Sequence, residues 1–167
     1  VPVLQNGIKI TMEPPKGVRA NIQRSYADLS EGYLETCEKG AAFKKLVFSC
    51  SFFHAVIQER RKFGPLGWNK AYDFSNSDLE TSLMTLRNFL NEQEQIPWSA
   101  MVYVTGMINY GGRVTDDLDR RLLMSILRKY YTHEVLDDSY KFTESGVYRA
   151  PLEGDFESYA SYIRDLP

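Results

Sequence analysis

The stretch that decides the fold is AAFKKLVFSCSFFHAVIQERRK, residues 41–62. Apolar side chains recur along it at helical spacing and form two stripes on roughly opposite sides. The first stripe contains Phe43, Leu46, Val47, Cys50, Phe53 and Ile57, and the second contains Phe48, Phe52 and Val56. A helix that is apolar on both sides must be covered on both sides. We therefore predict that residues 41–62 form the central helix of a bundle and end in the charged turn Glu59–Lys62.

Helical spacing is also present on both sides of this stretch. The apolar positions predict further helices over residues 18–29, 77–90, 97–110, 115–131 and 155–166. We expect Ser77 to open the second of these in a capping box with Glu80. Pro97 suits the first position of the third helix, and Thr115 is the expected N-cap of the fourth.

The remaining segments are predicted to be short or irregular. Residues 7–12, GIKITM, alternate in the manner of a strand, which the following prolines end. Glycine and proline mark residues 63–69 as a loop, and its Phe, Leu and Trp are expected to pack onto the core. The predicted fold class is therefore mainly α, a helical bundle with a short N-terminal strand and a C-terminal helix.

Composition excludes several classes of protein. The 167 residues contain 20 Lys plus Arg and 22 Asp plus Glu, a net charge of −2, which argues against a nucleic-acid or membrane-surface binder. No apolar run approaches the roughly 18–20 residues of a membrane span. The two cysteines, Cys37 and Cys50, are too few for a disulfide framework and favour a reducing compartment. We expect no nucleic acid and no membrane among the partners.

Motifs for nucleotide or metal chemistry are weak. The glycine spacing of Gly106–Arg113 fits a phosphate loop, but Gly112 stands where lysine is required, so a helix end and turn is the better interpretation. Cys50 and His54 lie four residues apart and make half of a zinc site or a Cys–His pair. Cys37 and His133 have no ligand-like spacing to them. A core histidine beside a buried thiol is the preferred interpretation, and we predict no catalytic residue, metal or cofactor.

Charged and aromatic residues near the helix ends are the candidates for an interface. They are Arg60, Arg61, Trp68, Arg113, Asp116 and Asp117. Ordinary helix-end chemistry explains much of this set, including the pairs Asp116–Arg120 and Asp117–Arg121. An interdomain role for the arginines is the alternative.

Several phrases in combination are more specific. They are GIKITMEPPKGVRANI (7–22), FFHAVIQERRKFGPLGWN (52–69), the SDL at 77–79, the IPW at 96–98 and NYGGRVTDDLDRRLL (109–123). Together they resemble the sixth AAA+ module of dynein heavy chains. Their residues are closer to those of axonemal heavy chains than to those of cytoplasmic heavy chains. The resemblance implies that residues 1–17 end the large subdomain and residues 18–140 form the helical lid. Residues 141–167 resemble the start of the C-terminal domain.

The resemblance implies a mechanical function. The chain would be a non-catalytic structural segment of a minus-end-directed microtubule motor, helping to close the AAA+ ring and to transmit ATP-driven conformational change. ATP and Mg would bind in other modules. The implied partners are the other AAA+ modules and C-terminal domain of the same heavy chain, the intermediate and light chains, and microtubules. The implied location is the cytoplasm and cytoskeleton, in particular the axoneme of a cilium or flagellum.

Details of the resemblance agree with a module that does not hydrolyse ATP. Met12 stands where asparagine commonly precedes Glu-Pro-Pro, and methionine cannot hydrogen-bond a catalytic water. Leu118 departs from a common tryptophan. Arg19 lies near the sensor arginine of other lids, but no nucleotide contact is predicted for it. The aromatic residues of 41–68 are expected to face the larger ring. A free-standing helical adaptor domain is the alternative to a motor segment.

Overall fold

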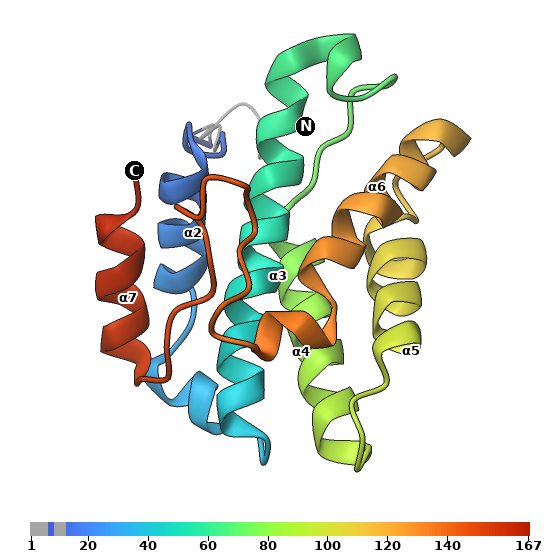
Figure 1. Ribbon diagram of the computed structural model, residues 1–167. Coiled ribbons are helices and arrows are strands. Elements are labelled where there is room, and N and C mark those ends of the chain that lie inside the picture. Colours follow the sequence, from blue (N-terminus) through green and yellow to red (C-terminus); the bar gives the residue numbers. More distant parts are fainter. Residues whose placement is uncertain (1–6, 9–12) are drawn as a thin grey trace.

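The structure, a computed structural model, describes residues 7–8 and 13–167, and these contain helices and no strand (Figure 1). The helices are α2 (Val18–Ala27), η1 (Glu31–Glu35), α3 (Gly40–Arg60), η2 (Arg61–Leu66), α4 (Asn76–Glu92), α5 (Trp98–Tyr103), η3 (Val104–Tyr110), α6 (Asp117–Tyr130), η4 (His133–Leu136) and α7 (Phe156–Asp165). The predicted helical bundle with a C-terminal helix is confirmed. The strand predicted for residues 7–12 falls largely outside the described residues.

Helix α3 lies at the centre of the bundle, as its two apolar stripes predict. Helices α2 and α7 lie on one side of it, while α4, α6 and then α5 lie on the other (Figure 1). Phe53 of the first stripe and Phe48 of the second are both fully buried. Within the described residues, only α3 together with η2 has the length and apolar composition of a membrane span. Most of that window is buried inside the protein, as in the core helix of a bundle.

The second stripe of α3 is covered by the C-terminal part of this same chain. The ring of Phe52 lies 5.1 Å from that of Phe142 and 5.2 Å from that of Tyr148. Phe48 stacks on Phe142 at 6.2 Å and meets the edge of Tyr162 at 5.8 Å. The expectation that these aromatic residues face a larger ring is therefore wrong for Phe48 and Phe52.

The covering segment, residues 137–154, crosses α3 without regular secondary structure (Figure 1). Within this segment, the backbone N–H of Phe142 donates to the carbonyl of Tyr148 over 2.8 Å and so closes a loop. Lys45 of α3 forms an ion pair with Asp138, and Lys44 donates to the carbonyl of Gly154 over 3.2 Å. Polar contacts at its edge thus hold the segment over the aromatic stripe.

Two helices begin at residues other than the predicted ones. Ser75, not Ser77, forms the capping box of α4, and its backbone N–H donates to the Asp78 carboxylate over 2.8 Å. Asp116, not Thr115, caps α6 by accepting from two successive backbone N–H groups at 2.9 and 3.0 Å. Both bonds go to one oxygen of a charged carboxylate, and hydrogen bonds to an ionised acceptor are stronger than those to a neutral hydroxyl. Pro97 is the residue before α5 and does not occupy its first position.

The segment predicted as one helix over 97–110 changes type along its length. It is α-helical to Tyr103 and continues as the π-helix η3. A side chain at Gly106 would put its Cβ 2.4 Å from the sulfur of Met124, so glycine allows η3 to approach α6 closely. The Gly106–Arg113 spacing therefore belongs to a helix and the turn after it.

Candidate functional site: an interdomain interface at the end of α3

The chain reverses direction at the end of α3 through residues 61–70, which we call the η2 tip (Figure 1). Gly64 adopts a positive φ of 52°, and its carbonyl accepts from the backbone N–H groups of Gly67 and Trp68 at 2.9 and 3.0 Å. This turn directs Phe63 and Leu66 outward, and they are 66% and 89% exposed. The prediction that the aromatic and aliphatic residues of this loop pack onto the core is wrong for these two and holds for Trp68, which is 3% exposed.

The side chains of Arg60 and Trp68 stabilise the η2 tip on its inner side. The indole N–H of Trp68 donates to the carbonyl of Ile57 over 3.2 Å. The guanidinium of Arg60 lies 5.5 Å from the Trp68 ring and donates to the carbonyl of Gly67 over 3.1 Å. A cation placed over an indole face is attracted to it, so the two side chains reinforce each other. Both predicted interface candidates therefore support the tip.

Asp119 fixes the chain that follows the tip to the start of α6. Its carboxylate accepts from the backbone N–H groups of Asn69 and Lys70 at 2.9 and 3.2 Å and from the hydroxyl of Tyr72 at 2.9 Å. Asp119 is only 3% exposed. The sequence gives no sign of this role, because an acidic residue in the first turn of a helix is already explained by the helix dipole.

The predicted acidic candidates contribute less to this contact. Asp116 accepts from the side-chain amide of Asn69 over 3.2 Å, besides capping α6. Hydrogen bonds, first from the backbone of Asp119 and then from Asn69, lower the pKa of Asp116. Asp117 is exposed and pairs with Arg120 at 3.4 Å. The predicted pairs Asp116–Arg120 and Asp117–Arg121 are therefore wrong, since Asp116 is engaged as the cap.

Arg61 and Glu59 belong to the outer side of the same end. Arg61 forms an exposed ion pair with Asp73. Glu59, predicted to lie in the charged turn that ends the central helix, accepts from the backbone N–H of Gly17 at 2.8 Å and from the side chain of Asn21 at 3.1 Å. Gly17 has a φ of 99°, which favours glycine, so this turn docks onto the end of α3 through a fixed backbone shape.

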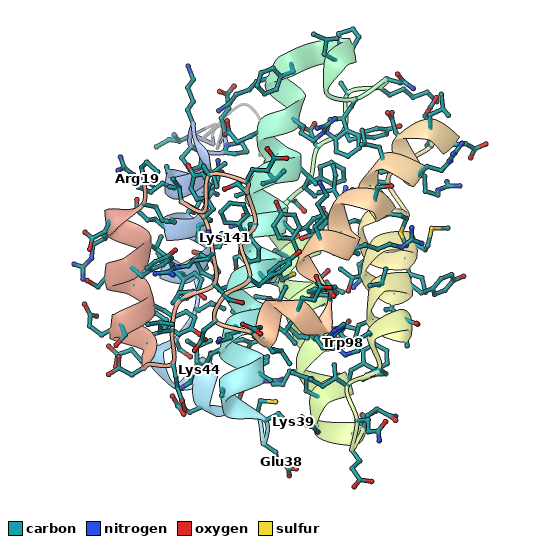
Figure 2. All side chains as sticks on the ribbon, viewed as in Figure 1. Arg19, Glu38, Lys39, Lys44, Trp98 and Lys141 are labelled. Carbon is teal, nitrogen blue, oxygen red and sulfur yellow. The ribbon has the colours of Figure 1, made fainter. Side chains whose placement is uncertain are left out.

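Arg19 has a partner within the chain. Its guanidinium donates to the carbonyl of Leu166 over 2.9 Å, so it joins the start of α2 to the end of α7 (Figure 2). This contact crosses 147 positions of sequence. No sequence pattern around Arg19 indicates such a contact.

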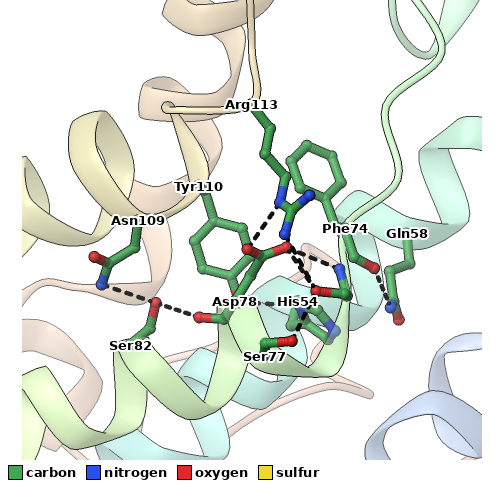
Figure 3. A network of polar contacts seen from close by, with 10 residues as sticks. His54, Gln58, Phe74, Ser77, Asp78, Ser82, Asn109, Tyr110 and Arg113 are labelled. Carbon is green, nitrogen blue, oxygen red and sulfur yellow. Dashed lines mark hydrogen bonds and ion pairs between the residues drawn. The ribbon is translucent and has the colours of Figure 1, made fainter.

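Arg113 lies apart from the η2 tip, in a polar network that ties η3 to α4 (Figure 3). Its Nε donates to the buried carboxylate of Asp78 over 2.9 Å. Asn109 donates to Ser82 over 3.2 Å in the same network. The end of the π-helix is thus fastened at two points to one face of α4. The structure therefore gathers the other five candidates around the tip and its support, and leaves Arg113 at the start of α4.

His54 and Cys50 lie in the core. Nδ1 of His54 is 2.9 Å from the hydroxyl of Tyr110, and within the described part of the chain its Nε2 has no hydrogen-bond partner (Figure 3). Burial lowers the pKa of His54 to about 4 and raises the pKa of Cys50 to about 12. Among the described residues, no three His, Cys, Asp or Glu side chains form a group that could hold a metal ion. This geometry describes a histidine held neutral between helices.

The buried neutral His54 makes a prediction about pH. Its folded pKa of about 4 lies below the ordinary 6.5, so the unfolded chain binds this proton first as the pH falls. We expect the free energy of unfolding to decrease by about 2 kcal/mol from this group between about pH 7.5 and pH 5. Urea denaturation at a series of pH values measures this. His54→Gln should flatten the dependence, whereas His133→Gln, at an exposed histidine, should leave it unchanged. An unchanged slope in His54→Gln would contradict the assignment.

Comparison with known proteins identifies this fold. The model of the dynein heavy chain AAA lid domain family matches residues 43–167. Dynein axonemal heavy chain 3 of Homo sapiens is 49% identical over 170 residues, and dynein axonemal heavy chain 6 of Homo sapiens is 47% identical over 167. Dynein axonemal heavy chain 12 of Mus musculus is 48% identical over 174 residues.

The alignments to these three relatives cover all of this chain but a small part of each relative. The chain spans 4% of the length of the first two relatives and 6% of the third. The family model that covers residues 43–167 includes α3 from Phe43 onward, the η2 tip and the C-terminal segment that covers the second stripe. The chain therefore belongs to the dynein heavy chain AAA lid domain family.

Proposed function

We propose that this chain is a non-catalytic lid segment of an axonemal dynein heavy chain. It helps to close the AAA+ ring and transmits ATP-driven conformational change during minus-end-directed movement along microtubules. ATP and Mg bind in other modules of the heavy chain, and this segment takes neither. Its partners are the neighbouring modules and C-terminal domain of the same chain. Intermediate chains, light chains and microtubules are reached through the whole motor, in the axoneme of a cilium or flagellum.

The observation that carries the proposal is the η2 tip. Phe63 and Leu66 are exposed apolar side chains, and such residues mark protein contacts. They sit directly at the end of α3, which is packed on both sides, and Trp68 and Asp119 hold the tip from within. Close-packed interiors transmit strain because they deform little. Force applied at the tip therefore acts on the whole bundle through α3.

The division of the chain follows the family resemblance. We propose that residues 1–17 end the large subdomain, residues 18–140 form the lid and residues 141–167 begin the C-terminal domain. Phe142 and Tyr148 pack directly on Phe52 of α3. A C-terminal domain attached through this segment would move together with the lid.

The experiment uses the motor region of the heavy chain that contains this segment. We expect Phe63→Ser combined with Leu66→Ser to lower the ratio of microtubule gliding velocity to ATP turnover by roughly two- to thirtyfold. The physical reason is that the tip loses its apolar contact surface while the nucleotide sites are untouched. Met84→Ser is the matched control, because Met84 is an exposed apolar residue of α4 away from the tip. An unchanged ratio in the double variant, or an equal loss in the control, would contradict the proposal.

A further inference from the structure

A second surface lies between α5 and α6, on a different part of the bundle from the η2 tip. It is a groove of about 430 Å³. Its walls include the aromatic residues Trp98, Tyr103 and Tyr131 together with Met124. Figure 2 places Trp98 toward the end of the bundle opposite to the tip. The groove is therefore independent of the contact on which the proposed function depends.

One wall of the groove has an unusual composition for a surface segment. Residues 98–110 contain no charged side chain at all. Tyr103 is 57% exposed and Ile108, further along, is 56% exposed. An outer helix that faces only water normally carries charged residues on its exposed side. This wall therefore has the character of a surface that another polypeptide covers.

The opposite wall carries one permanent cation. Arg128 and His133 line the groove, whereas Arg121 and Lys129 are exposed on the same helix as Arg128 and do not line it. Arg128 forms no ion pair with any residue in the described part of the chain. Glu134 is exposed next to His133 but does not line the groove. The groove thus combines an apolar floor with one permanent positive charge at its edge, that of Arg128.

We propose that this groove binds an acidic amphipathic helix of a polypeptide segment outside the 167 residues. Aliphatic or aromatic anchors of the helix would enter between Trp98 and Tyr131, and its carboxylates would face Arg128. Trp, Tyr and Arg are the residue types in which binding energy concentrates at interfaces, and a hydrophobic groove between two helices is a common receptor for a third. The chain spans 4% of the length of its human relatives, so most of such a heavy chain lies outside it.

Synthetic peptides and intrinsic fluorescence test this proposal. The probes are two helical peptides of about 14 residues, roughly four turns, with leucine along one face and either glutamate or lysine elsewhere. The chain has two tryptophans, and Trp68 is buried away from the groove, so a binding-dependent change should come from Trp98. Trp98→Phe should abolish the signal. We expect the glutamate peptide to bind at least about tenfold more tightly than the lysine peptide.

Charge reversal then locates the site. Arg128→Glu should weaken binding of the glutamate peptide by about tenfold or more and strengthen binding of the lysine peptide. Lys141→Glu makes the same charge change on the segment that crosses the other side of the bundle and should change neither affinity (Figure 2). Circular dichroism confirms that each variant is folded. Equal affinity for both peptides, no binding of either, or an unchanged affinity in Arg128→Glu would overturn the proposal. So would sedimentation showing that a second copy of the chain fills the groove.

Discussion

Replacing Phe52 with alanine is expected to lower the free energy of unfolding by about 3–5 kcal/mol. Phe52 is 2% exposed and lies in the middle of the second stripe of α3. Its ring contacts those of Tyr130, Phe142 and Tyr148 at centroid distances of 5.6, 5.1 and 5.2 Å. Truncation removes buried apolar surface and leaves a cavity between aromatic rings that cannot collapse easily. Urea denaturation followed by circular dichroism measures the change.

Phe63→Ala is the matched control for this prediction. Phe63 is the same residue type in the η2 tip that follows α3, but it is 66% exposed. Its truncation should change stability by less than about 0.5 kcal/mol, as for an ordinary surface position. A change below about 1 kcal/mol in Phe52→Ala would mean that residues 140–148 do not cover the second stripe in solution. That result would leave Phe48 and Phe52 free to contact a larger ring, as the sequence predicts.

The contrast between the two stripes shows what the sequence could predict. Helical spacing was sufficient to place Phe48 and Phe52 on a buried face, because burial follows from periodicity alone. It could not name the covering segment, since residues 137–154 have no periodic pattern and reach α3 through scattered contacts such as Lys45 with Asp138. From the sequence alone, the partner that covers the second stripe of α3 is therefore predicted to be a larger ring and not this chain's own C-terminal segment.

Helix starts were predicted to within two residues for a related reason. Ser75 precedes α4 and Ser77 lies in its first turn, while Thr115 and Asp116 both precede α6. Capping rules accept either member of each pair. The choice depends on which side chain reaches the free backbone N–H groups, and that depends on the path of the preceding loop. The π-helical turns of η3 had no signal of their own in the sequence.

The interface candidates were found by residue type, but their roles were not. Arg60 and Trp68 are interface candidates by residue type, but in the structure both support the η2 tip from inside. Asp119 was passed over, although it has more long-range hydrogen bonds than Asp116 or Asp117. Its partners lie 47 to 50 positions away in the chain, and local spacing rules do not extend that far.

Asp119→Ala is accordingly expected to lower the free energy of unfolding by about 3–4 kcal/mol. The substitution removes the acceptor of two backbone N–H groups and of the Tyr72 hydroxyl. Hydrogen bonds to a charged acceptor contribute more than neutral ones, and buried donors left without an acceptor add a desolvation penalty. Asp117→Ala, at the neighbouring exposed carboxylate, should cost less than about 1 kcal/mol, because an exposed ion pair contributes little.

Asp119→Asn removes the negative charge of this residue while nearly keeping its shape, so it tests how much the charge contributes to stability. The amide oxygen can still accept one or two of the three bonds, but the amide nitrogen is a donor and faces a donor in place of the second oxygen. We therefore expect a loss between those of Asp117→Ala and Asp119→Ala. Hydrogen exchange at the amides of Asn69 and Lys70 should accelerate in both Asp119 variants before global unfolding. Unchanged exchange there would show that the carboxylate does not hold the chain after the η2 tip, and the tip would then lack the rigid support that the proposed mechanical role needs.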